Sequence, residues 1–219
     1  MQPIETIRFY GILDTGYVSP AAWIAKYDAL AAGGAGIIQV RAKRETASEG
    51  ASLVKQVVEH RATLGLAHED QPYLVINDDL DLCLAYPGLG LHVGQDDLSP
   101  LVAREQLGPD RILGLSTHSL SQAQGALSLE TGTLDYFAVG PVFPTQTKPD
   151  YKAVGLDLVR QVSVLQPQLP FFCIGGINRQ NIAQVKAAGA RSIVTVSDVL
   201  CSDDTAQAVR DSIATLETD

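Results

Sequence analysis

The feature that most limits the fold of this 219-residue chain is a regular alternation of short apolar runs with longer helix-like stretches. Several of the apolar runs carry hydrophobic residues at successive positions, which is typical of parallel strands that are covered by helices. We therefore expect one parallel sheet whose strands are joined by helices. The expected strands are Phe9–Leu13, Gly36–Arg41, Tyr73–Asn77, Gly90–Val93, Ile112–Ser116, Tyr136–Val139, Phe171–Ile174 and Ser192–Val196.

Eight repeats of a strand followed by a helix close naturally into a barrel, and no proline- or serine-rich linker divides the chain. The sequence therefore predicts a single α/β domain over residues 1–219, folded as a (β/α)8 TIM barrel. The alternative is a doubly wound open sheet, which would need fewer strands or a second lobe. No G-x-G-x-x-G motif follows the first expected strand to support that alternative.

Proline and glycine mark where several helices are expected to begin and end. Ser19-Pro20 supplies a capping hydroxyl and a proline at the first helical position, and Gly33 is expected to stop that helix after Ala32. A later helix is expected to begin at Asn178 and to end at Gly189. These boundaries place the polar residues that follow each strand at one end of the barrel.

The composition limits which kinds of partner the protein can bind and in which cellular compartment we expect it. The net charge of −9 argues against nucleic acid or an anionic membrane as the main partner. No apolar stretch is long enough to cross a bilayer, and residues 1–8 lack the order of a secretory signal. The three cysteines have no C-x-x-C spacing, so we expect reduced, buried thiols in a cytoplasmic protein. The sequence leaves open whether the chain forms a homo-oligomer.

A cationic motif, Gln39-Val40-Arg41-Ala42-Lys43, ends the second expected strand. Side chains alternate across a strand, so Gln39, Arg41 and Lys43 point to one face and Val40 and Ala42 to the other. Two convergent cations in an acidic protein indicate an anion clamp, with arginine suited to forked phosphate recognition. The alternative is a frayed strand end whose charges are solvated.

Two acidic clusters follow the third and fourth expected strands, Asn77-Asp78-Asp79 and Gln95-Asp96-Asp97. Neighbouring strands of a barrel bring such clusters together, and carboxylate oxygens suit Mg²⁺ better than zinc. Each aspartate could instead cap a helix or stabilise a turn, which is a common role for this residue. The pairing across two strands favours a metal site.

Three later segments are candidates for phosphate binding. Residues 140–148 form a loop with two prolines, two threonine hydroxyls and Lys148, which could close over an oxyanion. Gly175-Gly176 and Val196-Ser197 follow the seventh and eighth expected strands, where barrels commonly bind phosphate. An ordinary turn is the alternative for each loop.

Among the four histidines, only His118, just beyond Ser116, is placed for chemistry. His60 and His68 are expected at the surface, and His92 is expected to pack after its strand. No Ser-His-Asp or Cys-His arrangement emerges from the order of these residues, so the sequence does not predict a side-chain nucleophile.

Taken in order, seven motifs resemble the thiamine phosphate synthase family, also called thiamine-phosphate pyrophosphorylase, over nearly the whole chain. The motifs are Gln39–Lys43, Ile76–Asp78, Gly90–Asp97, Gly114–His118, Gly140–Lys148, Ile174–Ile177 and Val196-Ser197. The resemblance implies a (β/α)8 barrel that joins a pyrimidine diphosphate to a thiazole phosphate, with release of pyrophosphate and with Mg²⁺ as cofactor.

The resemblance also implies a role for individual residues. Asp78 and Asp97 would bind Mg²⁺, and Arg41, Lys43, Ser116 and Lys148 would act on the departing pyrophosphate. The pyrimidine diphosphate would be held by Gln39, Val40, Arg41, Ala42, Lys43, Asn77, Ser116 and Lys148. The loop residues Thr145, Gln146 and Thr147, with Gly176, Val196 and Ser197, would bind substrate around the thiazole phosphate. Asp79, Leu89 and Asp198 depart from the family's usual pattern.

Two other functions remain open on the sequence alone. A thiazole tautomerase of the same fold would use His118 as acid and base and would not need a complete diphosphate clamp. A barrel that senses a phosphorylated metabolite would bind its ligand without turnover. The clamp formed by Arg41, Lys43 and Lys148 favours the synthase.

Overall fold

The computed structural model describes residues 2–67, 70–147 and 152–218. Eight parallel strands pair in chain order, and the last strand pairs with the first, so the sheet is a closed barrel. The predicted (β/α)8 barrel is therefore confirmed, and the open-sheet alternative is wrong. The strands are β1 Phe9–Asp14, β2 Ile37–Arg41, β3 Tyr73–Asn77, β4 Gly90–Val93, β5 Leu113–Thr117, β6 Tyr136–Val139, β7 Phe171–Cys173 and β8 Ile193–Thr195.

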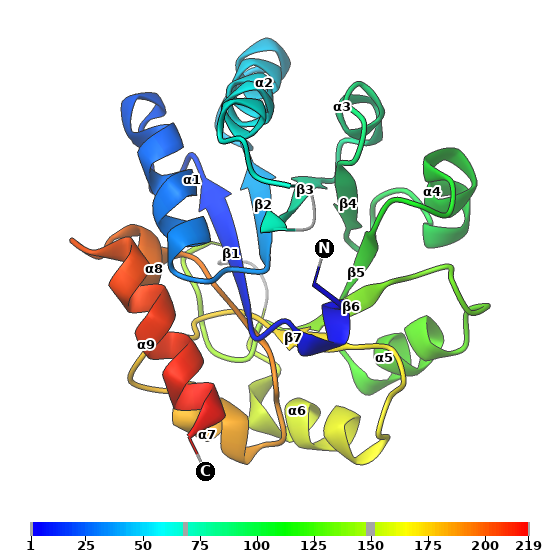
Figure 1. Ribbon diagram of the computed structural model, residues 1–219. Coiled ribbons are helices and arrows are strands. Elements are labelled where there is room, and N and C mark those ends of the chain that lie inside the picture. The colour runs from blue at the N-terminus through cyan, green and yellow to red at the C-terminus, as the bar shows by residue number, and fades with distance from the viewer. Residues whose placement is uncertain (1, 68–69, 148–151, 219) are drawn as a thin grey trace.

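Helices surround the barrel on its outside, and the final helix lies beside the first, which completes the ring (Figure 1). The short 3₁₀ segments are η1 Ile4–Thr6 and η2 Pro20–Ala22. The α-helices are α1 Trp23–Ala32, α2 Ala47–Thr63, α3 Leu80–Leu84, α4 Pro100–Leu107, α5 Leu120–Leu127, α6 Gly155–Val164, α7 Ile182–Ala187, α8 Ser197–Leu200 and α9 Thr205–Glu217.

Two helix boundaries test the sequence predictions. Helix α1 ends at Ala32 with Gly33 as its cap, as predicted, although a 3₁₀ turn precedes it after Pro20. Helix α7 begins at Ile182, so the predicted start at Asn178 is wrong. The Oδ1 atom of Asn181 accepts a hydrogen bond from the Asn178 amide at 2.8 Å. The Asn178 side chain in turn accepts from the Gln180 amide at 2.9 Å, and the backbone carbonyl of Asn178 accepts from the amides of Asn181 and Ile182. Asn178 therefore caps a turn over residues 179–181, and the regular helix follows that turn.

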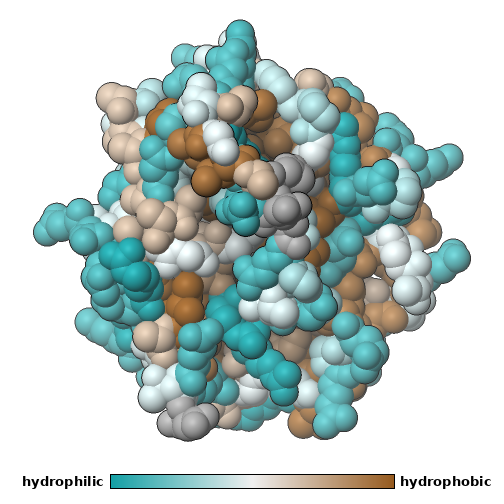
Figure 2. All heavy atoms as spheres, in the orientation of Figure 1, coloured by the Kyte–Doolittle hydropathy of each residue, from teal (hydrophilic) through white to brown (hydrophobic). Residues whose placement is uncertain are grey.

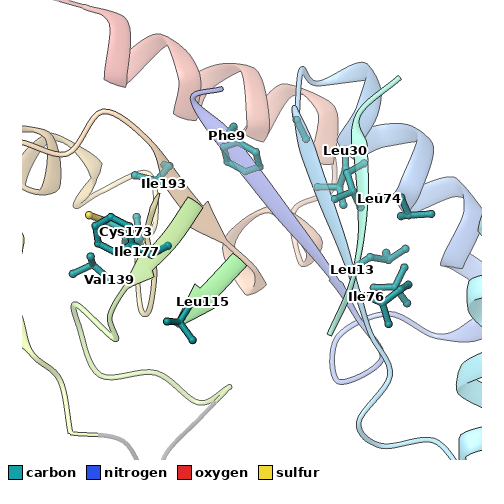
Figure 3. Packing of buried hydrophobic residues seen from close by; sticks show 14 of the residues in the cluster. Phe9, Leu13, Leu30, Leu74, Ile76, Leu115, Val139, Cys173, Ile177 and Ile193 are labelled. Atoms are coloured by element: carbon teal, nitrogen blue, oxygen red, sulfur yellow. The ribbon is translucent and has the colours of Figure 1, made fainter. Parts of the chain in front are cut away.

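The barrel has two apolar layers because side chains alternate along every strand. The inner layer, inside the barrel, consists of Ile7, Tyr10, Ile12, Ile37, Val75, Ile112, Tyr136, Phe172 and Val194. The outer layer lies between the strands and the helices. Figure 3 shows part of it, with Phe9 and Leu74 of the strands and Leu30 of α1. The polar residues at the strand ends belong to the inward-facing set, so the fold gathers them in one place.

The outside of the molecule is mixed in polarity. Hydrophilic side chains cover much of the face seen in Figure 2, with apolar side chains between them. No helix in the described part of the chain is both long and apolar enough to cross a membrane. Cys83 and Cys173 are buried free thiols, as expected, whereas Cys201 is exposed, so the expectation of burial is wrong for that cysteine.

Candidate active site

A cavity of about 580 Å³ opens at the carboxyl ends of the strands; it is lined by residues from seven of them and by the segment that follows β7. Its volume lies within the range of small-molecule sites, and its position is where barrel enzymes build their active sites. The predicted residues that line it are Gln39, Arg41, Asn77, Asp78, Ser116, Thr145, Gln146, Thr147, Gly176, Val196 and Ser197.

Four predicted residues do not line this cavity. Val40 is buried in the outer layer and Ala42 packs against that layer, as the alternation along β2 requires. Lys43 is half exposed, and its Nζ lies 2.6 Å from Asp78 Oδ2. Asp97 lies in the loop after β4, where its Oδ2 accepts from the Gly94 amide at 2.7 Å. The predicted Lys148 falls outside the described residues.

Arg41 is held by an aspartate at the end of the neighbouring strand β1. Its Nη1 donates to Asp14 Oδ2 at 2.6 Å, and Asp14 is 1% exposed. The other carboxylate oxygen of Asp14 accepts from the Gly16 amide at 2.7 Å. The guanidinium is thereby fixed in the cavity wall, with N–H groups left for an anionic ligand; its buried Nε has no partner among the described residues. The sequence analysis did not identify Asp14 as a site residue. Its position, as an acidic residue at the end of an otherwise apolar strand, was the signal that could have identified it.

The acidic residues after β3 have different roles. Asp78 has a φ of 63°, in the left-handed region, and its Oδ2 accepts from Asn77 Nδ2 at 2.7 Å as well as from Lys43. Asp79 instead caps α3, because its Oδ1 accepts from the Leu82 amide at 2.9 Å. Thus the cap interpretation is correct for Asp79, and Asp78 is left facing the cavity.

Metal binding by protein atoms alone would need more ligands than this region offers. Within the described ranges, no three histidine, cysteine, aspartate or glutamate side chains meet as a metal-binding group. Asp78 and Asp97 come from loops after the neighbouring strands β3 and β4, and both are carboxylates. Mg²⁺ is commonly held by one or two carboxylates, with substrate phosphates and water completing its shell. Asp78, which lines the cavity, fits that pattern, and the part of Asp97 in it stays a prediction because Asp97 does not line the cavity.

His92 is a part of the cavity wall that the sequence analysis missed. Its Nε2 lies 2.9 Å from Ser116 Oγ and its Nδ1 lies 3.0 Å from the hydroxyl of Tyr136. The expectation that His92 only packs is therefore wrong, and a Ser–His pair exists that the residue order did not reveal. His118 also lines the cavity, where its Nδ1 donates to the carbonyl of Gly140.

Loops from β1, β6, β7 and β8 surround the opposite part of the cavity. The Tyr17 hydroxyl lies 3.0 Å from Thr147 Oγ1, which links the β1 and β6 loops. Gly176 has a φ of 62°, and a Cβ there would lie 2.6 Å from the carbonyl oxygen of Pro144. Only glycine allows the β6 and β7 loops to approach this closely. Asp198 is paired with Arg179 at 3.1 Å, so its charge beside Ser197 is offset.

A closed parallel barrel that gathers cationic, carboxylate and hydroxyl groups around one cavity defines an α/β-barrel enzyme acting on phosphorylated small molecules. The sequence model of the family described as thiamine monophosphate synthase matches residues 9–199. The chain belongs to that family.

Individual relatives agree with this assignment. The chain is 41% identical to a thiamine-phosphate synthase of Mycolicibacterium gilvum over 180 residues, which cover 81% of this chain and 74% of the relative. It is 40% identical to a thiamine-phosphate synthase of Acidothermus cellulolyticus, over 86% of this chain and 85% of the relative. A solved thiamine phosphate pyrophosphorylase from Pyrococcus furiosus has 26% identity and a TM-score of 0.77, over 97% of this chain and 96% of that one.

The pair formed by Asp14 and Arg41 makes a testable contribution to stability. Asp14→Ala is expected to lower the free energy of unfolding by about 3 kcal/mol, because it leaves a largely buried guanidinium without its counter-charge. Arg41→Met in the Asp14→Ala background should recover part of the loss. Urea denaturation measures both. Asp157→Ala is the control, since its exposed ion pair with Arg160 is worth less than about 1 kcal/mol. Equal losses for Asp14→Ala and Asp157→Ala would contradict the assigned role of Asp14.

Proposed function

We propose that the chain condenses 4-amino-2-methyl-5-(diphosphooxymethyl)pyrimidine with 4-methyl-5-(2-phosphooxyethyl)thiazole to give thiamine phosphate and pyrophosphate. It is then a transferase of thiamine biosynthesis. The observation that carries the proposal is the single cavity in which Arg41 and Asp78 occupy one side and the Thr145–Thr147 and Gly176 loops another. Two phosphorylated substrates need two anion sites facing a common reaction centre. The free thiols of all three cysteines suit a cytoplasmic enzyme.

The diphosphate is assigned to the β2, β3 and β5 side of the cavity. Arg41 and Ser116 offer N–H and O–H donors there, and Lys43 and Lys148 are the proposed further cations. Gln39 and Asn77 line the same region beside the pyrimidine. Val40 and Ala42 face the outer layer, so any contact from them to substrate must come from their backbone atoms.

The thiazole phosphate is assigned to the loops after β6, β7 and β8. Thr145, Gln146 and Thr147 supply polar side chains, and Gly176 leaves room for close approach by an anion. Val196 follows β8 and Ser197 begins α8, in the position where barrels commonly bind phosphate.

The reaction requires no side-chain nucleophile. The carbon–oxygen bond of the pyrimidine methylene breaks with its electron pair going to pyrophosphate, and the lone pair of the thiazole nitrogen then forms the new carbon–nitrogen bond. Arg41, Lys43 and Lys148 stabilise the charge that develops on the departing oxygen. Residues of the apolar inner layer that line the cavity, including Tyr10 and Ile12, keep water away from the cationic carbon.

Mg²⁺ is proposed to be held by Asp78 and Asp97 together with oxygens of the diphosphate. Bound there, the ion would supply Lewis-acid neutralisation of the leaving group. Contacts within the chain hold the two carboxylates in position: Asn77 and Lys43 both contact Asp78 Oδ2, and the Gly94 amide donates to Asp97.

Direct incubation tests the function. When it is incubated with both phosphorylated heterocycles and Mg²⁺, the protein is expected to form thiamine phosphate and pyrophosphate in equal amounts. Chromatography of the reaction mixture measures both products. His118→Ala should leave this coupling largely intact, because His118 is assigned no role in it. Isomerase activity that depends on His118, without coupling, would favour the tautomerase. Binding of the substrates by the parent protein with no turnover would favour the sensor.

Metal dependence tests the assignment of the two aspartates. A chelator should abolish coupling, and Asp97→Asn should raise the Mg²⁺ concentration needed for half-maximal rate about tenfold or more, since ligand removal weakens a site that has few protein ligands. Titration of the initial rate with Mg²⁺ measures the shift. Asp96→Asn, at the neighbouring position, is the matched control and should titrate like the parent. Unchanged Mg²⁺ dependence in Asp97→Asn would remove it from the metal site.

Arg41 and Lys148 are expected to act on one leaving group. Arg41→Ala and Lys148→Ala should each reduce kcat by roughly a hundredfold, about 3 kcal/mol, with a smaller rise in KM, because the contacts strengthen in the transition state. The double variant should lose less than the product of the two effects. Steady-state measurement of kcat and KM for the two single variants and the double variant tests this expectation. Near-normal turnover in either single variant would place the diphosphate elsewhere.

A further inference from the structure

A continuous series of hydrogen bonds crosses the inside of the barrel at the cavity wall, and four of its five residues line the cavity. It runs from Gln39 through Tyr10, Tyr136 and His92 to Ser116. Gln39 Nε2 lies 2.6 Å from the Tyr10 hydroxyl, and that hydroxyl lies 3.2 Å from the hydroxyl of Tyr136. Tyr136 then lies 3.0 Å from His92 Nδ1, and His92 Nε2 lies 2.9 Å from Ser116 Oγ. Five strands of the barrel contribute one residue each.

The register of the sheet builds this series. His92 on β4, Gly114 on β5 and Tyr136 on β6 are direct partners across the three strands. A Cβ atom at Gly114 would lie 2.1 Å from Cζ of Tyr136, so the absence of a side chain there lets the tyrosine ring lie across β5 to reach His92. Ser116 is two residues beyond Gly114, on the same face of β5 and one layer nearer the cavity.

The direction of the hydrogen bonds is set at the Gln39 end, because the hydroxyls of Tyr10, Tyr136 and Ser116 can each donate or accept. The amide nitrogen of Gln39 donates and cannot accept, so the oxygen of Tyr10 accepts and its hydrogen is available to Tyr136. If each hydroxyl hydrogen is used within the series, Tyr136 donates to His92 Nδ1. An imidazole nitrogen that accepts carries no hydrogen, which leaves the ring proton on Nε2, facing Ser116.

The surroundings keep both phenols as donors. Burial raises the pKa of Tyr10 and of Tyr136 far above the ordinary value, and their mutual contact further raises that of Tyr136. His92 is 8% exposed and stacks on the Tyr136 ring, with an interplanar angle of 26°. These contacts hold the imidazole in one orientation.

We propose that this series fixes His92 as its Nε2–H tautomer, so that Ser116 accepts from His92 and directs its own O–H into the cavity as a donor to the diphosphate. His92, Tyr136 and Tyr10 are then positioning residues for Ser116. The identity of the acceptor rests on the proposed function, whereas the tautomer of His92 does not. A serine without this support would rotate between donating to ligand and donating to the ring.

The tautomer is tested directly on the parent protein by ¹⁵N NMR of its imidazole groups, with His92→Gln used to assign the signal. The expected spectrum has a protonated Nε2 and an unprotonated Nδ1 at His92. In Tyr136→Phe, which removes the donor without changing the ring, the preference for this tautomer should weaken. A parent His92 that carries its proton on Nδ1, or on both nitrogens, would overturn the proposal whether or not the protein couples the two substrates.

Kinetics test the consequence for Ser116. Tyr136→Phe is expected to lower kcat about tenfold with KM changed less than about twofold, by analogy with the loss of other groups that orient a functional histidine. His92→Gln should retain more activity than His92→Asn, because its amide N–H can reach the place of Nε2. Tyr27→Phe is the matched control: it removes a buried hydroxyl that contacts Arg61 on α2, outside the series, and should keep the parent's kcat. Equal kcat in Tyr136→Phe and the parent would contradict the role of the series, as would equal losses in the Gln and Asn variants.

Discussion

Closure of the parallel barrel is the constraint on which the site depends. Once eight strands pair in a ring, every second residue of each strand must face one shared interior, and its partners come from strands far apart in the chain. Apolar residues fill the lower part of that interior, and polar residues occupy its carboxyl end. Arg41, Asp78 and Ser116 therefore line one cavity although none of them is close to another in sequence.

Much of this arrangement could be predicted from the sequence because it follows from local pattern. Strand runs and the alternation along β2 predicted that Gln39 and Arg41 would share a face and that Val40 would not. The contacts of Asp14 and His92 could not be predicted in this way. Asp14 finds its partner 27 residues away, and His92 finds the Tyr136 hydroxyl 44 residues away, so only the register of the closed sheet joins them.

The sequence also could not predict which of two adjacent residues of the same type would face the cavity. Asp78 and Asp79 are adjacent aspartates, but one faces the cavity in a left-handed conformation and the other caps a helix. Their separation depends on a backbone turn that no hydrophobic periodicity encodes. The predicted start of α7 was too early for a similar reason, because a turn over residues 179–181 separates Asn178 from the first regular helical residue, Ile182.

The close approach of the Tyr136 ring to Gly114 has a consequence for how this protein can change over evolution. The ring of Tyr136 occupies the volume that any side chain at position 114 would need. A larger residue at 114 is acceptable only if position 136 becomes smaller at the same time, and that exchange would also remove the hydroxyl beside His92. The two positions are therefore coupled: a side chain at 114 can be accepted only together with a smaller residue at 136, and not as a single substitution.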